Sequence, residues 1–256
     1  MYLNQNLIRV GSIFIFVYLL IKLQKKYINY LSEIDIEYEN NLNTIFNNYY
    51  HSFSIITIAT NGYNAHDLVT SLRIQGEWDK NIYIFEDICT PIEKNVNHLK
   101  IPNRVYNSIE SKKYKTKILQ NTSEEFVLFL DSDIIVNKPI KYFLNNIGAW
   151  NPECDIYMPK DLWYSGKYIW NSGIIFAKRN KSEKLLHLWY KKLSTNYTKN
   201  KDQPALKSVL INNLFNVCEI PDYVVYYLPD ISSRLRKIDT PIFTHYLKYK
   251  VNKEKC

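Results

Sequence analysis

Glycine is scarce in this sequence, with 6 glycines against 22 tyrosines and 11 phenylalanines. The interior should therefore be rich in large side chains.

The four cysteines, Cys89, Cys154, Cys218 and Cys256, form no CxxC pair and have no zinc-site spacing, which excludes the common cysteine-based zinc motifs. We expect ordinary core or surface thiols, and their number does not identify a cellular compartment.

The sequence also lacks an arginine-rich helix and any recognised nucleic-acid-binding motif, although its net charge is +8 from 33 basic and 25 acidic residues. The lysines are spread along the chain and often alternate with tyrosines. A solvated basic surface is the simplest interpretation, with a diphosphate-bearing substrate as the alternative. We therefore predict no nucleic-acid partner.

The chain has 256 residues, enough for one sizeable domain and a small appendage but not for two full domains. Its composition, 46% hydrophobic and 23% charged, is that of a globular protein rather than a disordered one. We expect one folded domain with a short extra segment.

The extra segment is the apolar amino terminus, which is followed by no small-residue cleavage site. Its uncharged run Val10–Ile21 is short for a spanning helix, although Arg9 and Lys22 could reach the membrane interfaces. We predict an uncleaved membrane anchor over residues 1–24, with a buried or interfacial helix as the alternative. Lysines after the segment favour a domain on the cytosolic face, whereas a type II arrangement would place it in the endoplasmic reticulum or Golgi lumen.

Apolar residues then recur at spacings of three and four from Tyr27 to Tyr49, which indicates one face of an amphipathic helix over residues 25–50. This helix could be a stem packed on the domain or the contact of a homodimer. The sequence does not choose between them.

From residue 51 to 256, apolar runs rich in β-branched residues alternate with segments of helical periodicity. This alternation predicts an α/β domain with a mostly parallel sheet covered by helices on both faces. Strands are expected at 53–60, 81–85, 126–130 and 173–177, with short ones near the end, and helices at 65–74, 112–120, 181–193 and 204–212.

The motif that carries chemistry is Asp131-Ser132-Asp133, directly after the apolar run FVLFL. A buried parallel strand delivers the loop that follows it to the carboxyl edge of the sheet, where ligands bind in open α/β folds. Two carboxylates separated by one residue can converge on a hard divalent cation, and such a cation can stabilise a leaving diphosphate. The alternative is a plain loop start, where aspartate pairs are common.

The segment KTKILQNTSEEFVLFLDSDIIV, residues 115–136, resembles the metal-binding region of glycosyltransferase family 8, which includes glycogenin and bacterial lipopolysaccharide galactosyltransferases. Further segments match in the same order: Trp170–Ile174, Asp202–Leu206, the string YYLPDI and Thr244–Tyr246. The resemblance covers about residues 52 to 249. It implies a GT-A fold, a Rossmann-like twisted sheet flanked by helices.

The resemblance also implies the metal ligands. Asp131 and Asp133 would bind manganese, with His245 as the third ligand. A neutral imidazole beside two carboxylates suits Mn²⁺ better than Mg²⁺, which remains the alternative. Without the family context, His245 would more simply be a structural histidine.

The donor nucleotide would lie against the loop after the first strand. Ala59, Thr60 and Asn61 would contact the nucleoside, Tyr63 could stack on it, and Ser132 would also contact the donor. A plain strand-to-helix turn is the alternative, because Asn-Gly suits one.

Lysines would contact the donor's phosphates. Lys117, and after it Lys115, matches a family lysine before the metal-binding strand, although surface exposure is the usual fate of a lysine. The family usually follows its histidine with Gly and then Lys-Pro-Trp, and this chain has neither; Lys248 or Lys250 could substitute for the missing lysine.

The side of the active site that binds the sugar and the acceptor would be lined by Asn171, Asp202 and Gln203. Gln203 or Asp202 would stabilise the sugar cation. Asn171 could instead simply shape a turn. Asp202 could also be the N-cap of the helix that Pro204 helps to start.

Together these features imply a metal-dependent transferase that uses a nucleotide-sugar donor. It would move a hexosyl group, from UDP-sugar by preference, to a hydroxyl of a glycan, glycoprotein or glycolipid, with retention of configuration. The alternative is an inactive membrane protein that binds nucleotide sugar or glycan, which the missing Gly and Lys-Pro-Trp would explain. A phosphatase of the haloacid-dehalogenase type is disfavoured. That family has its paired aspartates near the start of the domain, whereas Asp131 lies in the middle of this chain.

Overall fold

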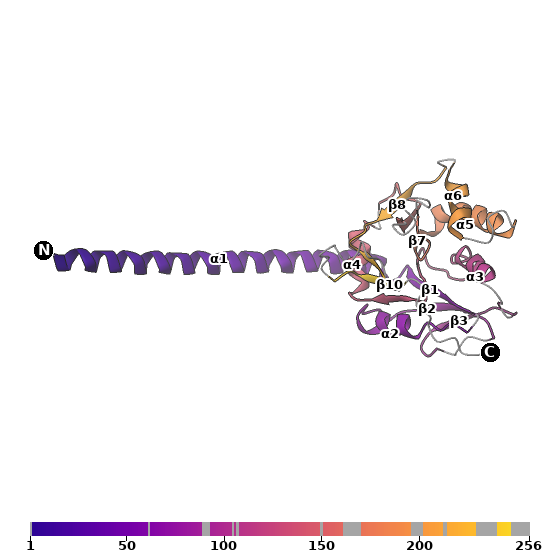
Figure 1. Ribbon diagram of the computed structural model, residues 1–256, viewed down its shortest axis with the longest axis horizontal. Helices are drawn as coiled ribbons and strands as arrows, with labels where there is room; N and C mark the ends of the chain where they lie inside the picture. Colours follow the sequence, from indigo (N-terminus) through magenta and orange to yellow (C-terminus); the bar gives the residue numbers. More distant parts are fainter. Residues whose placement is uncertain are drawn as a thin grey trace. The chain divides into compact units, whose positions relative to one another are not determined.

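The computed structural model describes residues 2–60, 62–88, 93–103, 105, 108–148, 151–160, 170–195, 202–211, 214–228 and 240–246. The chain divides into two compact units, Met1–Asn48 and Tyr49–Cys256. Figure 1 shows both units, of which the second contains the sheets.

Helix α1 (Tyr2–Tyr50) supplies the first unit as one continuous helix, which covers the residues predicted as anchor and as stem. Large apolar side chains along it, such as Tyr27, Leu31 and Ile34, are exposed. In the part of the chain that the structure describes, no helix has the length and apolar character needed to cross a membrane. This finding does not support the spanning anchor predicted over residues 1–24.

The second unit is built around a seven-stranded sheet with the order β3-β2-β1-β4-β7-β6-β8. The pairs β1–β2, β2–β3, β1–β4 and β6–β8 are parallel, and β7 is antiparallel to β4 and β6. The mostly parallel sheet predicted from the sequence is confirmed. Its strands are β1 (Phe53–Ala59), β2 (Ile82–Glu86), β3 (Asn97–Lys100), β4 (Phe126–Leu130), β6 (Ile156–Pro159), β7 (Ile174–Lys178) and β8 (Val217–Ile220).

One face of this sheet packs against the region of α3 (Ser108–Lys115), α5 (Arg179–Ser194) and α6 (Asp202–Leu210). Their buried side chains form one apolar cluster with those of β1, β4 and β7, and this cluster includes Phe129 and Trp189. Large aromatic side chains are fully buried, which agrees with the interior rich in large side chains expected from the scarcity of glycine.

On the opposite face lie α2 (His66–Ile74) and α4 (Ile140–Asn146). Phe176 of β7 contacts the rings of Phe143 in α4 and Phe53 in β1, at centroid distances of 6.1 and 6.0 Å. Sheet residues therefore alternate between two aromatic-rich layers, which fits a sheet covered on both faces.

The helix predicted at 112–120 is displaced. Helix α3 ends at Lys115, and the chain continues in tight turns in which the Thr116 amide donates to the Lys113 carbonyl and the Lys117 amide to the Tyr114 carbonyl. Bonds to the third preceding residue tighten the chain relative to an α-helix. Side chains beyond Lys115 therefore point in directions that a continued helix would not give them.

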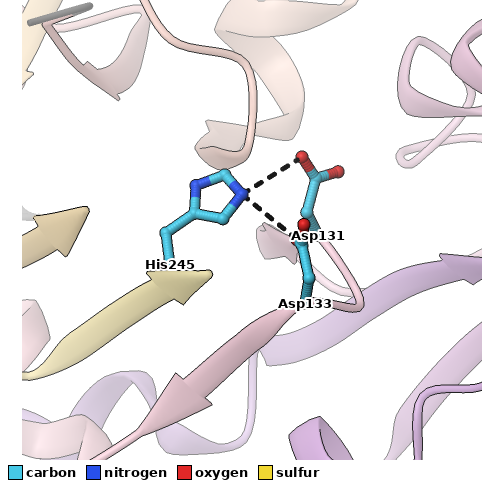
Figure 2. A group of neighbouring side chains, drawn as sticks. All are labelled: Asp131, Asp133 and His245. Atoms are coloured by element: carbon cyan, nitrogen blue, oxygen red, sulfur yellow. Dashed lines mark ion pairs between the residues drawn. The ribbon is translucent and has the colours of Figure 1, made fainter. Parts of the chain in front are cut away.

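A second sheet of three strands, β5 (Ile134–Val136), β10 (Phe243–Tyr246) and β9 (Val225–Leu228), has the order β5-β10-β9. Strand β10 is antiparallel to β5, with His245 opposite Ile134, and parallel to β9. This pairing places the end of the domain beside the loop after β4, and Figure 2 shows His245 pointing from β10 toward Asp131 and Asp133.

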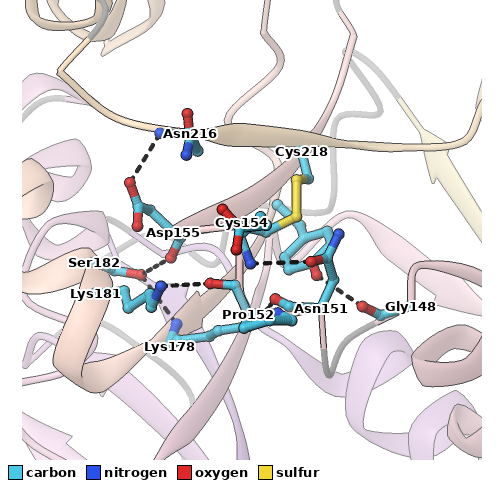
Figure 3. Close-up of a disulfide and its surroundings, with 12 residues drawn as sticks. Gly148, Asn151, Pro152, Cys154, Asp155, Lys178, Lys181, Ser182, Asn216 and Cys218 are labelled. Carbon is cyan, nitrogen blue, oxygen red and sulfur yellow. Dashed lines mark hydrogen bonds between the residues drawn. A yellow bond between two sulfur atoms is a disulfide. The ribbon is translucent and has the colours of Figure 1, made fainter.

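Cys154 and Cys218 form a disulfide (Figure 3), which corrects the expectation of free thiols. Cys154 lies just before β6 and Cys218 lies in β8, its parallel neighbour. Their Cα atoms are 5.6 Å apart, inside the range that a disulfide can bridge. Sequence spacing could not show this, because the pairing depends on which strands lie side by side; Cys89 and Cys256 lie outside the described residues.

Candidate active site

The site begins at the carboxyl end of β4, a fully buried strand. The Asp131 amide donates to the Gly173 carbonyl at 2.8 Å, and the Asp133 carbonyl accepts from the Tyr246 amide at 3.0 Å. The loop between β4 and β5 is therefore held by β7 on one side and β10 on the other. Both aspartate side chains remain partly exposed.

His245 completes a group of three ligand-type side chains (Figure 2). Its Nε2 atom lies 3.1 Å from Asp133 Oδ1 and 3.9 Å from Asp131 Oδ2, and its side chain is buried. One ligand atom from each of the three residues lies within 4.8 Å of the other two. Two carboxylate oxygens and one imidazole nitrogen are a donor set that a divalent cation such as Mn²⁺ can use.

Lys115 lies between two carboxylates. Its Nζ atom is 2.8 Å from Asp131 Oδ1 and 3.3 Å from Asp202 Oδ2, and it donates to the Ser172 carbonyl at 3.1 Å. Burial lowers the pKa of this ammonium group, but Asp131 and Asp202 outweigh burial and raise the pKa above the usual lysine value. The buried Lys115 is therefore a permanent positive charge.

Asp202 begins α6, and both of its carboxylate oxygens are engaged. Oδ2 accepts from the Ser172 hydroxyl at 2.7 Å as well as from Lys115, and Oδ1 lies 3.2 Å from Lys112 Nζ. Burial alone would raise the pKa of Asp202, but Lys115, Lys112 and the Ser172 hydroxyl hold the pKa well below its usual range. Asp202 is therefore ionised and fixed in position.

The helix start differs from the N-cap that was predicted, because Asp202 is itself the first residue of α6. Its side chain bonds to Ser172 and the lysines, and its carbonyl accepts from the indole nitrogen of Trp189 at 2.9 Å. Pro204 is tolerated because it lies in the first turn, where no intrahelical partner for its nitrogen is needed.

Asn171 and Gly173 shape the turn into β7. The Asn171 side-chain oxygen accepts from the Gly173 amide at 2.7 Å, which is the turn-forming role considered from the sequence. A Cβ atom at Gly173 would overlap the His245 ring and approach Asp131 and Asn171 at 3.0 Å. Only glycine leaves room for the histidine beside the aspartates.

The two candidate lysines lie in different surroundings. Lys117 Nζ lies over the rings of Tyr114 and Tyr190, at 5.2 and 5.3 Å from their centroids. The sequence favoured Lys117 over Lys115, yet it is Lys115 that the structure brings to the carboxylates. Lys115 is the last residue of α3, whereas Lys117 lies in the turns that follow it.

The other predicted donor contacts lie in two loops. Ala59 and Thr60 are buried at the end of β1, and the half-buried Tyr63 donates its amide to the Thr60 carbonyl at 3.2 Å. Ser132 is half-buried in the loop that carries the aspartates. Asn61 and Lys248 lie outside the described residues.

Lys112 and Ser172 are site residues that the sequence analysis did not single out. Lys112 lies one helical turn before Lys115, so that spacing could have paired them on one face of the helix. Ser172 lies within the Trp170–Ile174 segment, where the resemblance pointed to its neighbour Asn171 instead. Gln203 lines an adjoining pocket with Trp170.

Comparison with solved structures shows the fold. The domain is similar to the galactosyltransferase LgtC in complex with donor and acceptor sugar analogues, with a TM-score of 0.52, 14% identity, 76% of this chain and 87% of that one covered. It is similar to the glycosyltransferase GlyE of Streptococcus pneumoniae TIGR4 (TM-score 0.56, 12% identity, 76% and 55% covered). It also resembles a glycosyltransferase involved in the glycosylation of the major capsid of PBCV-1 (TM-score 0.53, 14% identity, 75% and 92% covered). The fold is therefore of the GT-A type.

Comparison with curated proteins gives no match. A family model described as nucleotide-diphospho-sugar transferase does match, over residues 115–255. That range is more than half of the chain and contains the two aspartates of the loop after β4, Asp202 and His245. The chain therefore belongs to the nucleotide-diphospho-sugar transferase family.

Proposed function

We propose that this chain is a metal-dependent, retaining glycosyltransferase of the family 8 type. It transfers a hexosyl group from a UDP-sugar to a hydroxyl of a glycan, glycoprotein or glycolipid. The observation that carries the proposal is the convergence of Asp131, Asp133 and His245 beside the buried pair Lys115–Asp202.

The three converging side chains fit a divalent cation, and they would hold Mn²⁺ in preference to Mg²⁺ because one ligand is an imidazole nitrogen. When bound, the cation supplies Lewis-acid stabilisation of the negative charge on the leaving diphosphate. Gly173 supports this fit, because the missing Cβ leaves the space that the His245 ring occupies.

Lys115 contributes a fixed positive charge next to Asp131. Because its pKa is raised, the charge is present at every physiological pH. A preorganised charge costs no reorganisation when negative charge develops on a phosphate oxygen. Lys115 therefore assists departure of the nucleoside diphosphate.

Asp202 is suited to stabilise positive charge rather than to accept a proton. Its low pKa makes it a weak base, and Lys112, Lys115 and Ser172 occupy its oxygens. In the retaining step, the acceptor oxygen bonds to the anomeric carbon on the face from which the phosphate oxygen leaves. The hydroxyl proton passes to the departing diphosphate, and Asp202 stabilises the positive sugar ring, with Asn171 and Gln203 lining the same side.

Nucleotide release from a panel of UDP- and GDP-sugars tests the proposal. We expect release that requires Mn²⁺, is strongest with a UDP-sugar and falls by at least about 100-fold in Asp133→Asn, because one of three metal ligands is lost. Asp79→Asn makes the same chemical change at an exposed aspartate of the same unit and should keep wild-type rates. Metal-independent release, or full activity of Asp133→Asn, would contradict the proposal.

Product stereochemistry tests retention separately. The anomeric configuration of the product, measured by NMR, should match that of the donor. An inverted product would contradict retention.

A further inference from the structure

A pocket of about 340 Å³ lies along α6 and β8. Its walls include Trp170, Gln203, Leu206, Lys207, Ile211 and Phe215. Its volume falls within the range of small-molecule sites.

The pocket adjoins the candidate active site through two segments of the chain. Gln203 follows Asp202, whose carboxylate bonds to Lys115 and Ser172. Trp170 precedes Asn171 and Ser172 in the turn that leads into β7. The same two segments therefore supply residues to both the candidate active site and the pocket.

The lining is mostly apolar, with two aromatic rings, one amide and one ammonium group. Ligand pockets typically combine apolar walls with a few polar groups that orient the ligand. A free sugar would find few polar partners here, whereas an apolar group attached to a sugar would find many apolar ones. Gln203, at the end next to Asp202, is placed to contact the hydroxylated part.

One apolar residue of the pocket wall is open to solvent. Ile211, just after α6, is 69% exposed. An apolar group bound in the pocket would cover this side chain as well as the buried walls.

We propose that this pocket is an acceptor subsite that binds the alkyl chain of a glycolipid-type acceptor, so that the sugar hydroxyl lies beside Asp202 and Gln203. The inference rests on the proposed function and narrows its acceptor from glycans in general to alkyl glycosides. Each methylene removed from water contributes about 0.8 kcal/mol, so a short chain suffices for a measurable preference.

Binding and turnover of paired acceptors test the subsite. The probes are n-octyl and methyl β-D-galactopyranoside, and the corresponding glucosides, below the micellar concentration with the full chain. Binding is measured by saturation-transfer NMR without donor, and acceptor kcat/KM is measured by nucleotide release. We expect the octyl glycoside to bind at least about tenfold more tightly than the methyl glycoside, with a matching gain in kcat/KM.

Ile211→Asn should abolish the octyl preference while leaving methyl glycoside binding and donor hydrolysis unchanged. Ile74→Asn is the matched control, because Ile74 is 66% exposed on α2 and lies outside the pocket. Exposed positions are used so that neither variant should lose its fold.

Equal binding of octyl and methyl glycosides, or equal loss of preference in both variants, would overturn the subsite. A change in oligomeric state on gel filtration caused by Ile211→Asn alone would assign the pocket to a second copy of the chain and would also overturn it. Absence of nucleotide release from every donor, with the octyl preference intact in binding, would instead contradict the proposed function and support the subsite.

Discussion

Lys115 shows how a single buried charge organises the site. Its Nζ atom lies within 3.3 Å of carboxylate oxygens of both Asp131 and Asp202. The pKa of Lys115 is raised, because attraction to these carboxylates outweighs the cost of burying an ammonium group. Removing one partner of a buried pair leaves the other charge without compensation, which is more costly than the net value of the pair. Lys115 should therefore matter for stability as well as for activity.

Replacing Lys115 and Lys117 separately tests this difference. We expect Lys115→Met to lower the free energy of unfolding by about 3 kcal/mol, the low end for a buried pair, because Asp131 is 27% exposed. Lys117→Met should lower it by about 0.5–1 kcal/mol, since only contacts with aromatic rings are lost. Urea unfolding measures both values. Equal losses of unfolding free energy in the two variants would contradict the proposal that Lys115 stabilises the site through its buried ion pairs.

Asp202 predicts a dependence of stability on pH. Its pKa in the folded chain lies below the unfolded value of about 3.9, so the folded chain releases this proton more readily. The stabilisation is complete above the unfolded pKa and is lost as the pH falls through the folded pKa. The difference in unfolding free energy between wild type and Asp202→Asn should therefore be constant above about pH 5 and shrink below about pH 4, by up to about 1.4 kcal/mol per pH unit.

A difference that stays constant down to about pH 3 would show that the lysines do not hold Asp202 ionised. Asp79→Asn, an exposed position, carries the same change of charge and serves as the control for general acid effects.

The three converging side chains could be named from the sequence and the resemblance, whereas the residues around them could be named only in part. Asp131 and Asp133 follow an unmistakable buried strand, and the resemblance supplied His245. The choice between Lys115 and Lys117 depended on where one helix ends, and a shift of two residues moves a side chain to another face. Ser172 bonds to Asp202 through a fold contact across 30 positions, which no local pattern reveals.

At the scale of elements, strands with strong apolar character were predicted well. The run FVLFL is β4 to the residue, because five consecutive apolar side chains need cover on both faces. The antiparallel direction of β7 was not predicted, since direction depends on the path of the chain and not on the residues of the strand. The pairing of β5 with β10, which brings His245 to the aspartates, is likewise a long-range choice.

The disulfide between Cys154 and Cys218 joins the chain just before β6 to β8, the parallel neighbour of β6, across a sequence separation of 64 residues. A cross-link of this span lowers the conformational entropy of the unfolded chain. Reduction of the disulfide should therefore lower the free energy of unfolding by about 2–4 kcal/mol. Urea unfolding with and without dithiothreitol measures the change.

The double variant Cys154→Ser/Cys218→Ser is the control, because it should start at the reduced stability and show no response to dithiothreitol. Since Cys89 and Cys256 remain in this variant, an equal response to reductant in both proteins would assign the effect to those cysteines instead.

At the scale of the whole molecule, the alternation of strands and helices was sufficient to predict an α/β domain, and the GT-A resemblance agrees with the solved structures. The role of the amino-terminal segment was harder to predict, because the length of its apolar run lies between those typical of buried and of membrane-spanning helices. The solved transferases share this fold with TM-scores of 0.52–0.56 although their identity to the chain is only 12–14%.

Ligand-dependent thermal stability tests donor binding by the molecule as a whole. A ligand that binds only the folded state at about 100 times its dissociation constant stabilises that state by about 2.7 kcal/mol. For a domain of this size, UDP with Mn²⁺ should then raise Tm by about 5–10 °C. The increase should disappear with EDTA and in Asp133→Asn, because binding of the diphosphate depends on the cation held by Asp131, Asp133 and His245.

The same measurement separates an enzyme from a binding protein. Stabilisation by UDP and Mn²⁺ together with nucleotide release from a UDP-sugar supports the transferase. Stabilisation without release from any donor would favour a protein that binds nucleotide sugar without turnover, because folded-state binding requires only the ground-state contacts whereas release also requires stabilisation of the departing diphosphate. If no nucleotide raises Tm in the wild type, the convergence of the two aspartates and His245 would have to serve something other than a nucleotide-sugar donor.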